Sequence, residues 1–346
     1  MGCVNDGEAV VSTLRVGVIG TGVMGTDHAV ILDRFVSGAV VTRVSDVDGD
    51  RVAAVAARLS GATVSPEAFA LIADPEVDAV VIASSDATHA GLAIAAVRAG
   101  KPVLCEKPLA PTLAEAADVA RTVERDGPGL LSLGFMRRFD PAHVELKTAL
   151  AAGACGAPLL VHCISRGVSS GPGATSESSI TGSAVHEFDT VPWLLGAPVV
   201  EVSWHAPRRS GEVDGLQDPQ LILLRTADGV LSTVEVFLNA RYGYDVRCEV
   251  VGERGVLGTT SQAPVIRDAA GTRSSGYPAD WRPRFADAYR LELRAWVDAV
   301  TTGVPTPLAT SRDGLVAAAV SDAVITSMMA GGGWIAVAVP TEGEGG

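Results

Sequence analysis

The chain has 346 residues, of which 47% are hydrophobic and 19% charged, so it is long enough for two globular domains and too apolar for a disordered protein. Its formal net charge of −13 argues against a nucleic-acid or anionic-membrane partner, because either would need a concentrated basic surface. The cysteines are widely spaced, with no Cys-x-x-Cys pair. This predicts neither a disulfide framework nor a metal site, and it favours a reducing cytoplasm.

Residues 1–13 are interpreted as an N-terminal extension. No signal peptide is expected, because residues 2–12 hold acidic residues and no basic ones. The longest apolar stretch, Leu315 to Ala330, is interrupted by Ser321 and Asp322 and is too short for a membrane span.

Short β-branched runs alternate with alanine-rich helical stretches between residues 14 and 134. The expected strands are Leu14–Gly20, Val40–Asp46, Val77–Ser84, Pro102–Cys105 and Leu130–Gly134, and the expected helices are Met24–Val36, Asp50–Leu59, His89–Ala99 and Leu113–Arg125. Nearly continuous apolar strands that alternate with helices indicate a parallel sheet covered on both faces. We therefore predict an α/β fold whose first domain, residues 14–134, is a doubly wound Rossmann domain.

The pattern changes in residues 135–346. After a linking helix, Asp140–Ala152, strand-like runs follow one another without helices between them: Leu159–Ile164, Val199–His205, Leu221–Arg225, Val230–Leu238 and Val246–Val251. Two closing helices are expected at Phe285–Val300 and Asp313–Met329, with a final edge strand at Trp334–Val339. This order predicts an α+β domain with a large, open, mostly antiparallel sheet. Gly171 to Ser179 is predicted to be a flexible active-site loop.

A glycine-rich turn, Gly20-Thr21-Gly22-Val23-Met24-Gly25, follows the first strand and opens a helix. Gly20 permits the tight turn, Gly22 lets the backbone approach a pyrophosphate, and Gly25 permits close packing of helix on strand. Val23 and Met24 then belong to the helix N-terminus, whose free N–H groups face the phosphates. Asp46 ends the next strand and is expected to bind the ribose hydroxyls, which predicts NAD rather than NADP.

Two further segments lie at the carboxyl ends of later strands. Ser84 follows one strand, and Thr88 and His89 either line the nicotinamide ribose or cap the helix that follows; the sequence leaves both readings open. Glu106 and Lys107, in the run Glu106-Lys107-Pro108, place an ammonium group beside the expected nicotinamide. These segments together predict a dehydrogenase.

The chain resembles the Gfo/Idh/MocA oxidoreductase family, and within it the inositol 2-dehydrogenases. The resemblance covers nearly the whole chain and rests on segments in the same order, namely Gly20–Gly25, Glu106–Pro108, Gly134–Asp140, Val185–Asp189, Arg241–Asp245 with Cys248–Glu253, and Asp280–Tyr289.

The resemblance implies a role for particular residues. Lys107 would hold the reacting hydroxyl, and His186 would take its proton while hydride passes to the nicotinamide. Arg137 or Arg138, with Tyr242 or Tyr244, would contact substrate hydroxyls. An imidazole is a suitable base near neutral pH, and a neighbouring cation favours an alkoxide-like transition state. In this family a second subunit usually covers the open sheet, so a homotetramer or a dimer is expected.

The departures from the family pattern lie around the substrate. Gly182 stands where an aspartate would orient His186, and Ser165-Arg166-Gly167 stands where His-Arg-Asn is the pattern. Loss of the orienting carboxylate should weaken the base. Loss of polar partners should disfavour simple inositol, so we expect a larger or less hydroxylated cyclitol, sugar or glycoside. Glu177 or Asp189 could replace the missing carboxylate.

Two other functions are compatible with these residues. One is an NADH-dependent reductase of a ketone or imine, in which the imidazolium or Lys107 acts as the acid. The other is a redox-inert NAD-binding sensor, which would bind the cofactor without turnover.

Overall fold

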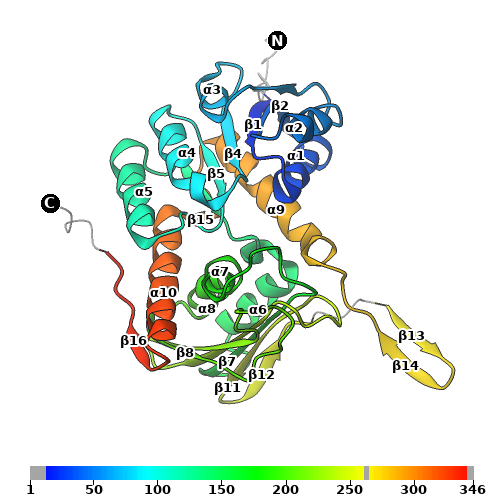
Figure 1. Ribbon diagram of the computed structural model, residues 1–346, viewed down its shortest axis with the longest axis vertical. Helices are drawn as coiled ribbons and strands as arrows, with labels where there is room; N and C mark the ends of the chain where they lie inside the picture. The colour runs from blue at the N-terminus through cyan, green and yellow to red at the C-terminus, as the bar shows by residue number, and fades with distance from the viewer. Residues whose placement is uncertain (1–12, 261–264, 341–346) are drawn as a thin grey trace, which may run out of the picture.

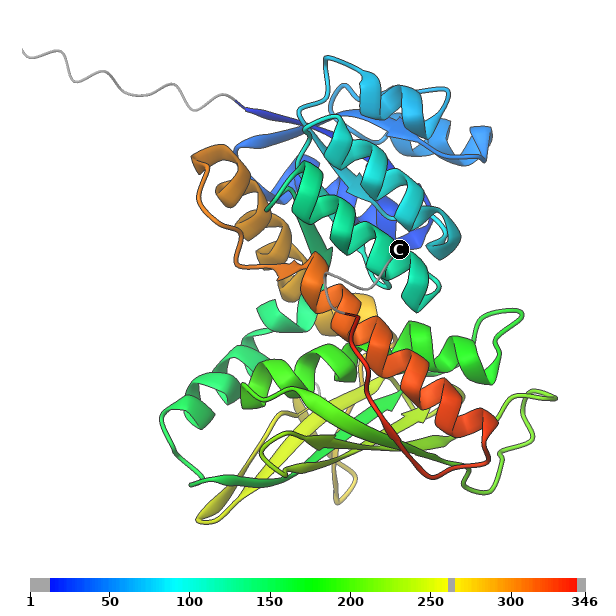
Figure 2. The ribbon, with the colours of Figure 1, turned by 90° about the vertical axis from the view of Figure 1, so that its left-hand side faces the viewer.

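A computed structural model describes residues 13–260 and 265–340 of the chain. The fold has two lobes, each built on its own large sheet, and helices of the second lobe lie between the two sheets (Figures 1 and 2). The expected extension, residues 1–13, lies outside the described residues except for Thr13.

The first lobe contains a seven-stranded sheet with the order β15-β6-β5-β4-β1-β2-β3. Strands β1 to β6 are parallel, and β15 pairs antiparallel with β6. This is the doubly wound order, which reverses direction beside β1. The strands are β1 (Leu14–Ile19), β2 (Ala39–Ser45), β3 (Thr63–Val64), β4 (Ala79–Ile82), β5 (Val103–Glu106), β6 (Leu131–Gly134) and β15 (Ala309–Thr310). The predicted Rossmann fold is confirmed.

Both faces of this sheet are covered by helices. On one face α1 (Val23–Phe35) and α2 (Gly49–Ala56) form a core together with α9 (Trp281–Thr302). On the other face α3 (Ala68–Ala73), α4 (Asp86–Arg98) and α5 (Leu113–Asp126) share a core with α10 (Ser311–Met329). The two closing helices and β15 therefore return from the second half of the chain to the first lobe. Sequence periodicity predicted these helices but not where they pack.

The second lobe contains a seven-stranded sheet with the order β12-β11-β7-β10-β9-β8-β16. Its pairings are antiparallel except for β7 with β10, so the expected mostly antiparallel sheet is confirmed. The strands are β7 (Pro158–Arg166), β8 (Val199–His205), β9 (Gln220–Thr226), β10 (Leu231–Phe237), β11 (Asp245–Gly252), β12 (Gly255–Gly258) and β16 (Trp334–Ala336). The expected final edge strand is β16.

Helices cover only the face of the second sheet that is turned toward the first lobe (Figure 2). They are α6 (Pro141–Ala151), α8 (Val185–Leu195) and part of α10. Side chains on β7 and β10 alternate between buried and half-buried, as expected for strands with one covered face. Within the described residues, nothing covers the other face. A separate hairpin of β13 (Ile266–Ala269) and β14 (Thr272–Ser275) extends away from the body (Figure 1).

The segment that joins β7 to α8 differs from the expected flexible loop. Only its first part is irregular, because α7 (Ser176–Ser179) begins after the Thr175 cap and a π-helical turn, Ile180–Ala184, follows it. No helix of residues 13–260 and 265–340 is long and apolar enough to cross a bilayer.

Candidate active site

A cleft of about 770 Å³ lies between the lobes, at the carboxyl edge of the first sheet. Its walls come from four regions that are far apart in the sequence. These are the N-terminus of α1, the ends of β4 and β5, the 3-10 turn η1 (Met136–Phe139) with β7, and the π-turn with α8. The start of α9 closes the cleft through Trp281 and Tyr289.

The glycine-rich turn has the geometry of a pyrophosphate cradle. Gly20 has a φ of +89°, and a Cβ at Gly25 would lie 1.8 Å from the Gly20 carbonyl oxygen, so neither position accepts a side chain. A Cβ at Gly22 would meet nothing within 4 Å, because this glycine faces open space. Val23 and Met24 at the start of α1 line the cleft. The residues present therefore fit a dinucleotide, with phosphates at the N-terminus of α1.

Asp46 follows β2 at the same edge, where an adenosine ribose is expected. Its carboxylate accepts hydrogen bonds from the Thr21 amide (2.5 Å) and hydroxyl (2.9 Å) and forms an ion pair with Arg51 (2.5 Å). Burial raises the pKa of Asp46, but Arg51 and the amides of Asp48 and Thr21 lower it far below its ordinary value. The carboxylate is therefore ionised. The adjacent Arg51 cation was not anticipated from the sequence, whereas Arg43 is turned away and binds Asp74 (2.7 Å).

The turn after β4 contributes Ser84 and His89 to the cleft, but Thr88 is absent from its lining. Thr88 instead hydrogen-bonds Ser84 (2.7 Å) and the Ser85 carbonyl (2.7 Å), as a residue in the first turn of a helix does. Of the two readings left open for Thr88, the helix-capping one fits these contacts.

His89 joins two loops at the floor of the cleft. Its Nδ1 lies 2.7 Å from the Pro108 carbonyl oxygen and its Nε2 3.2 Å from that of Ser84. Burial lowers the pKa of His89, but Cys105 and the Pro108 carbonyl raise it to about 10. Only the doubly protonated ring can donate to both carbonyls, so these contacts favour the imidazolium form of His89.

Lys107 and His186 come together across the cleft from opposite lobes. Lys107 Nζ donates to the Gly182 carbonyl oxygen (3.1 Å), which belongs to the π-turn immediately before α8. Gly182, Ser183 and His186 line the cleft on this side. The π-turn thus presents both an anchor for the ammonium group and the imidazole, and such turns are frequent at functional sites.

His186 lacks a partner on its inner side. Its Nδ1 is buried and has no hydrogen bond within the described part of the chain, while Nε2 is not among the buried unpaired atoms. Burial lowers the pKa of His186 well below its ordinary value, and the positive charges of Lys107 and Arg137 lower it further. The imidazole is therefore neutral near pH 7.

Neither carboxylate suggested as a replacement at Gly182 is available to His186. Asp189 is engaged by Arg138, whose Nε lies 3.0 Å away, and Arg138 also reaches Asp313 on α10 (3.1 Å). Glu177 lies on α7 with an exposed side chain and has no contact with His186. That expectation is wrong for both residues. A Cβ at Gly182 would meet nothing within 4 Å, so the space for a carboxylate is open.

The three small residues do not all enlarge the pocket. Ser165 is buried on β7 and lines the cleft, as does the backbone at Gly167. A Cβ at Gly167, however, would come 2.9 Å from the Leu238 carbonyl oxygen. The expected hollow is therefore open at Gly182 but filled by the backbone of Leu238 at Gly167.

The arginine and tyrosine candidates separate into residues inside and outside the cleft. Arg137 lines it, but its guanidinium forms an ion pair with Glu187 of α8, and both side chains are almost fully buried. Tyr244 also lines the cleft, and burial raises its pKa to about 12. Tyr242 is not in the lining, because its hydroxyl donates to Asp245 (2.6 Å) and accepts from Arg166 (3.0 Å) on a half-exposed surface. Of the predicted alternatives, Arg137 and Tyr244 line the cleft and Arg138 and Tyr242 do not; contact with substrate hydroxyls stays a prediction.

Sequence reasoning missed His28, which contacts the predicted residue Glu106 beside Lys107. Glu106 ends β5, and its Oε1 lies 2.8 Å from Nε2 of His28, three residues after Gly25 on α1. Tyr289 of α9 packs edge-on against the His28 ring, with centroids 5.7 Å apart. A histidine on the buried face of the helix that follows the glycine turn was the available signal.

The comparisons with known proteins agree with this geometry. Residues 14–134 match the model described as "Oxidoreductase family, NAD-binding Rossmann fold", and residues 143–258 match "GFO/IDH/MocA C-terminal domain". Inositol 2-dehydrogenase 2 of Paenarthrobacter aurescens is 52% identical over 324 residues, which is 92% of this chain and 97% of the relative. Inositol 2-dehydrogenase 1 of Saccharopolyspora erythraea is 48% identical over 315 residues, or 90% of this chain and 93% of the relative.

A solved structure has the same fold throughout. The crystal structure of myo-inositol dehydrogenase from Lactobacillus casei, in complex with NAD(H) and myo-inositol, superposes with a TM-score of 0.90 and 32% identity, covering 95% of this chain and 98% of that one. The predictions of an NAD cofactor and of an NAD-dependent dehydrogenase that acts on CH–OH groups are confirmed. The chain belongs to the Gfo/Idh/MocA oxidoreductase family.

Proposed function

We propose that this protein oxidises a secondary alcohol of a cyclitol, or of a related sugar or glycoside, with Lys107 and His186 at the reacting carbinol. The observation that carries the proposal is that Lys107, which donates to the Gly182 carbonyl oxygen, and His186 line the same cleft, beside the glycine turn. The relatives are named as inositol dehydrogenases, which supports a cyclitol as the substrate class.

The chemistry divides between the two lobes. Lys107 donates to the substrate hydroxyl oxygen and stabilises the negative charge that develops on it. Neutral His186 accepts the hydroxyl proton at Nε2, with its own proton on the buried Nδ1. NAD, when bound, supplies the hydride acceptor.

Substrate selection is proposed to depend on Gly182. The open space at this position lies beside both Lys107 and His186, so a substrate with an additional group there fits without steric conflict. A myo-inositol ring would leave this space to water and His186 without an orienting carboxylate. We infer that the preferred substrate is larger than inositol at this position.

A reductase is the second candidate, favoured by the unpartnered Nδ1 of His186. Without a carboxylate to stabilise an imidazolium, proton transfer from the hydroxyl to His186 is less favourable. In the reverse direction Lys107 supplies the proton to a carbonyl or imine, and His186 has a lesser role.

The division of labour between the halves of the chain is also a proposal. Residues 14–134 would bind the cofactor and residues 135–346 the substrate.

The uncovered sheet face presents apolar side chains such as Leu221, Leu223 and Leu231. Cover by other subunits would bury them, so we propose a homo-oligomer, a tetramer or a dimer, in the cytoplasm. Sedimentation of the purified protein measures this state directly.

The deciding experiment measures NADH formation from NAD⁺ over a panel of inositols, free sugars, glycosides and aminocyclitols. Activity on a larger or amino-substituted member with little on myo-inositol is expected. Gly182→Asp should then gain activity on myo-inositol, whereas Gly167→Asn should not, because its side chain meets the Leu238 backbone. Ordinary turnover of myo-inositol by the unchanged protein would contradict the pocket argument.

If no alcohol in the panel is oxidised, the same protein is assayed in the reducing direction. NADH consumption would then be followed with ketones and imines, and turnover there would favour the reductase. NAD binding with no turnover in either direction would identify a redox-inert sensor.

A further inference from the structure

The nicotinamide end of the cleft can be located from the sheet order. The pyrophosphate lies at β1, and Asp46 at the end of β2 marks the adenosine side. The nicotinamide must therefore lie on the other side of β1, over the ends of β4 and β5. Glu106 and Lys107 are at the end of β5, and His89 follows β4.

Positive charge accumulates at this end. The Lys107 ammonium lies across the cleft from His186, and His89 is held by the carbonyl oxygens of Pro108 and Ser84 in an arrangement that favours its imidazolium. The oxidised nicotinamide ring is itself a cation, whereas the reduced ring is neutral. The two cations of the protein would therefore disfavour the oxidised cofactor in particular, unless an anion offsets them.

Glu106 is placed to be that anion. Its carboxylate is buried but lines the cleft. One oxygen faces His28 Nε2 (2.8 Å), and the other accepts the Lys107 amide (3.2 Å). The neighbouring strand makes room for it, since a Cβ at Gly134 would come 3.2 Å from the carboxyl group.

His28 holds Glu106 without cancelling its charge. The Nδ1 of His28 is buried and has no partner among residues 13–260 and 265–340. Because Nε2 faces a carboxylate oxygen it carries the ring proton, and Nδ1 has no acceptor among these residues that would favour a second one, so the ring is taken as a neutral Nε2–H donor. The pair therefore keeps a net negative charge. His28 and Lys107 lower the pKa of Glu106 although burial raises it.

We propose that the His28–Glu106 pair is a fixed counter-charge for the nicotinamide, which makes the protein bind the oxidised cofactor in preference to the reduced one. Glu106 acts on the cofactor ring through its charge, and His28 acts as a positioning residue through Glu106. The proposal concerns the cofactor and is independent of the substrate.

The test is the ratio of the dissociation constants for NADH and NAD⁺, measured by fluorescence titration and calorimetry on the full-length protein without substrate. Glu106→Gln keeps the shape and removes the charge. It should weaken NAD⁺ binding about tenfold and change NADH binding less than twofold. Retained NADH binding also reports that the variant is folded. An unchanged ratio overturns the proposal, and this includes the case in which the affinities for NAD⁺ and NADH fall equally.

The chain offers a matched control in Glu292 of α9. This glutamate is also buried, more deeply than Glu106, and neither of its oxygens has a hydrogen bond within the described residues. Burial, with the charges of Glu106 and Asp189, raises the pKa of Glu292 well above its ordinary value, so it is uncharged. Glu292→Gln should leave the ratio unchanged. If Glu292→Gln lowers the preference for NAD⁺ over NADH as much as Glu106→Gln does, the charge of Glu106 is not the cause and the proposal is overturned.

A second variant tests the role of His28 by pH. His28→Leu leaves Glu106 buried without its donor, which raises the pKa of the carboxyl group. The groups facing Glu106 are His28 from α1, Tyr289 and Glu292 from α9, and Lys107 and His89 at the strand ends. In this variant the NAD⁺ preference should persist at high pH and disappear as pH falls and Glu106 is protonated. A preference that follows the wild-type pH profile would overturn the role of His28.

Discussion

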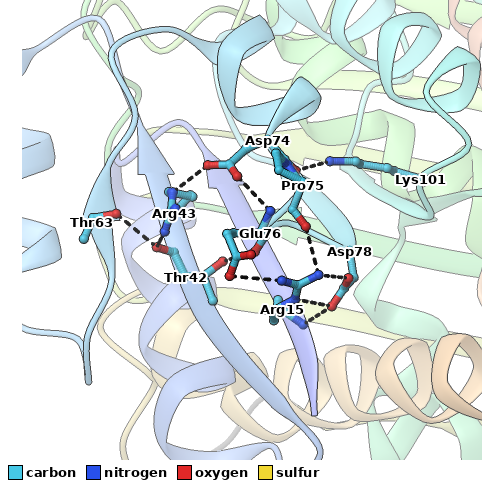
Figure 3. A network of polar contacts seen from close by, with 9 residues as sticks. All are labelled: Arg15, Thr42, Arg43, Thr63, Asp74, Pro75, Glu76, Asp78 and Lys101. Atoms are coloured by element: carbon cyan, nitrogen blue, oxygen red, sulfur yellow. Dashed lines mark hydrogen bonds and ion pairs between the residues drawn. The ribbon is translucent and has the colours of Figure 1, made fainter. Parts of the chain in front are cut away.

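The amino and carboxyl edges of the first sheet, where its parallel strands begin and end, differ in how fully their polar side chains are paired. At the amino edge Arg15 donates to both oxygens of Asp78 (3.0 and 2.7 Å) and to the Pro75 carbonyl (2.9 Å), as Figure 3 shows. Arg43 binds Asp74 (2.7 Å), and Lys101 caps the Asp74 carbonyl (2.7 Å). Each charged side chain drawn there has a partner of opposite charge or a carbonyl oxygen.

At the carboxyl edge, buried polar atoms are left unpaired. Nδ1 of His28, Nε of Arg137 and Nδ1 of His186 have no partner within the described residues, and all three belong to residues in or next to the cleft. Unpaired buried groups are costly, so a fold retains them where they serve another purpose. Unpaired atoms also occur away from the cleft, at Ser232 and Glu292, so the comparison sets a paired network at the amino edge against an incompletely paired one around the cleft.

The largest expected effect is a difference in turnover between variants of two lysines, one from each edge. Lys107→Met should lower turnover about a thousandfold, because it removes the cation beside the developing alkoxide. NAD⁺ binding should be no weaker than in the unchanged protein. Lys101→Met at the amino edge is the control and should leave turnover unchanged. Steady-state rates and cofactor titrations of both variants measure this, and equal losses would erase the distinction between the edges.

The pH dependence of kcat/KM tests the absence of a partner for Nδ1 of His186. The imidazole must be neutral to accept a proton, so kcat/KM for oxidation falls as pH falls through its pKa. Because burial and nearby cations lower that pKa below 6.5, the acid limb should lie below the ordinary imidazole range. Gly182→Asp places a carboxylate beside the ring and should move the limb up by about one pH unit. Gly91→Asp on the exposed face of α4 should not move it.

A buried ion pair at the cleft should matter for stability more than the surface pairs at the amino edge. Arg137→Met leaves Glu187 buried without its partner and should reduce the free energy of unfolding by about 3–5 kcal/mol. The double variant with Glu187→Gln should recover part of this loss. Urea denaturation of the single and double variants provides the values, and additive losses would show that the two side chains do not depend on each other.

The smallest effect is expected at the amino edge itself. Arg15→Gln removes ion pairs whose side chains are more than a third exposed, and water replaces such contacts at little cost. The unfolding midpoint should shift less than for Arg137→Met, and the dissociation constant for NAD⁺ should not change. A loss of cofactor affinity in this variant would show that the two edges are coupled.

The cofactor half of the site could be predicted from the sequence because its residues lie in short motifs. Gly20, Gly22 and Gly25 serve one turn and one helix, and Asp46 follows the next strand. The glycines act through the backbone of their own βα unit and the Asp46 carboxylate directly follows its strand, so spacing along the chain is enough to predict where these residues lie. The same holds for Lys107, which directly follows a strand.

The substrate half could be predicted only in part. Arg137, Tyr242 and Tyr244 were grouped from their motifs, yet only Arg137 and Tyr244 line the cleft, and Arg137 is bound to Glu187. Asp189 is paired with Arg138 and is therefore not free to orient His186. The ion pairs of Arg137 and Asp189 join residues 50 and 51 positions apart in the sequence.

The sequence by itself determined the two-lobed α/β architecture, the cofactor motif and the family, because hydrophobic period, glycine geometry and strand-end positions act over short distances along the chain. Only the tertiary structure decided that α9 and α10 return to the first lobe, that the π-turn presents the Gly182 carbonyl to Lys107, and that His28 holds Glu106. Those contacts join strands and helices from different parts of the chain. Their geometry is set by how whole elements pack, which no local pattern of residues encodes.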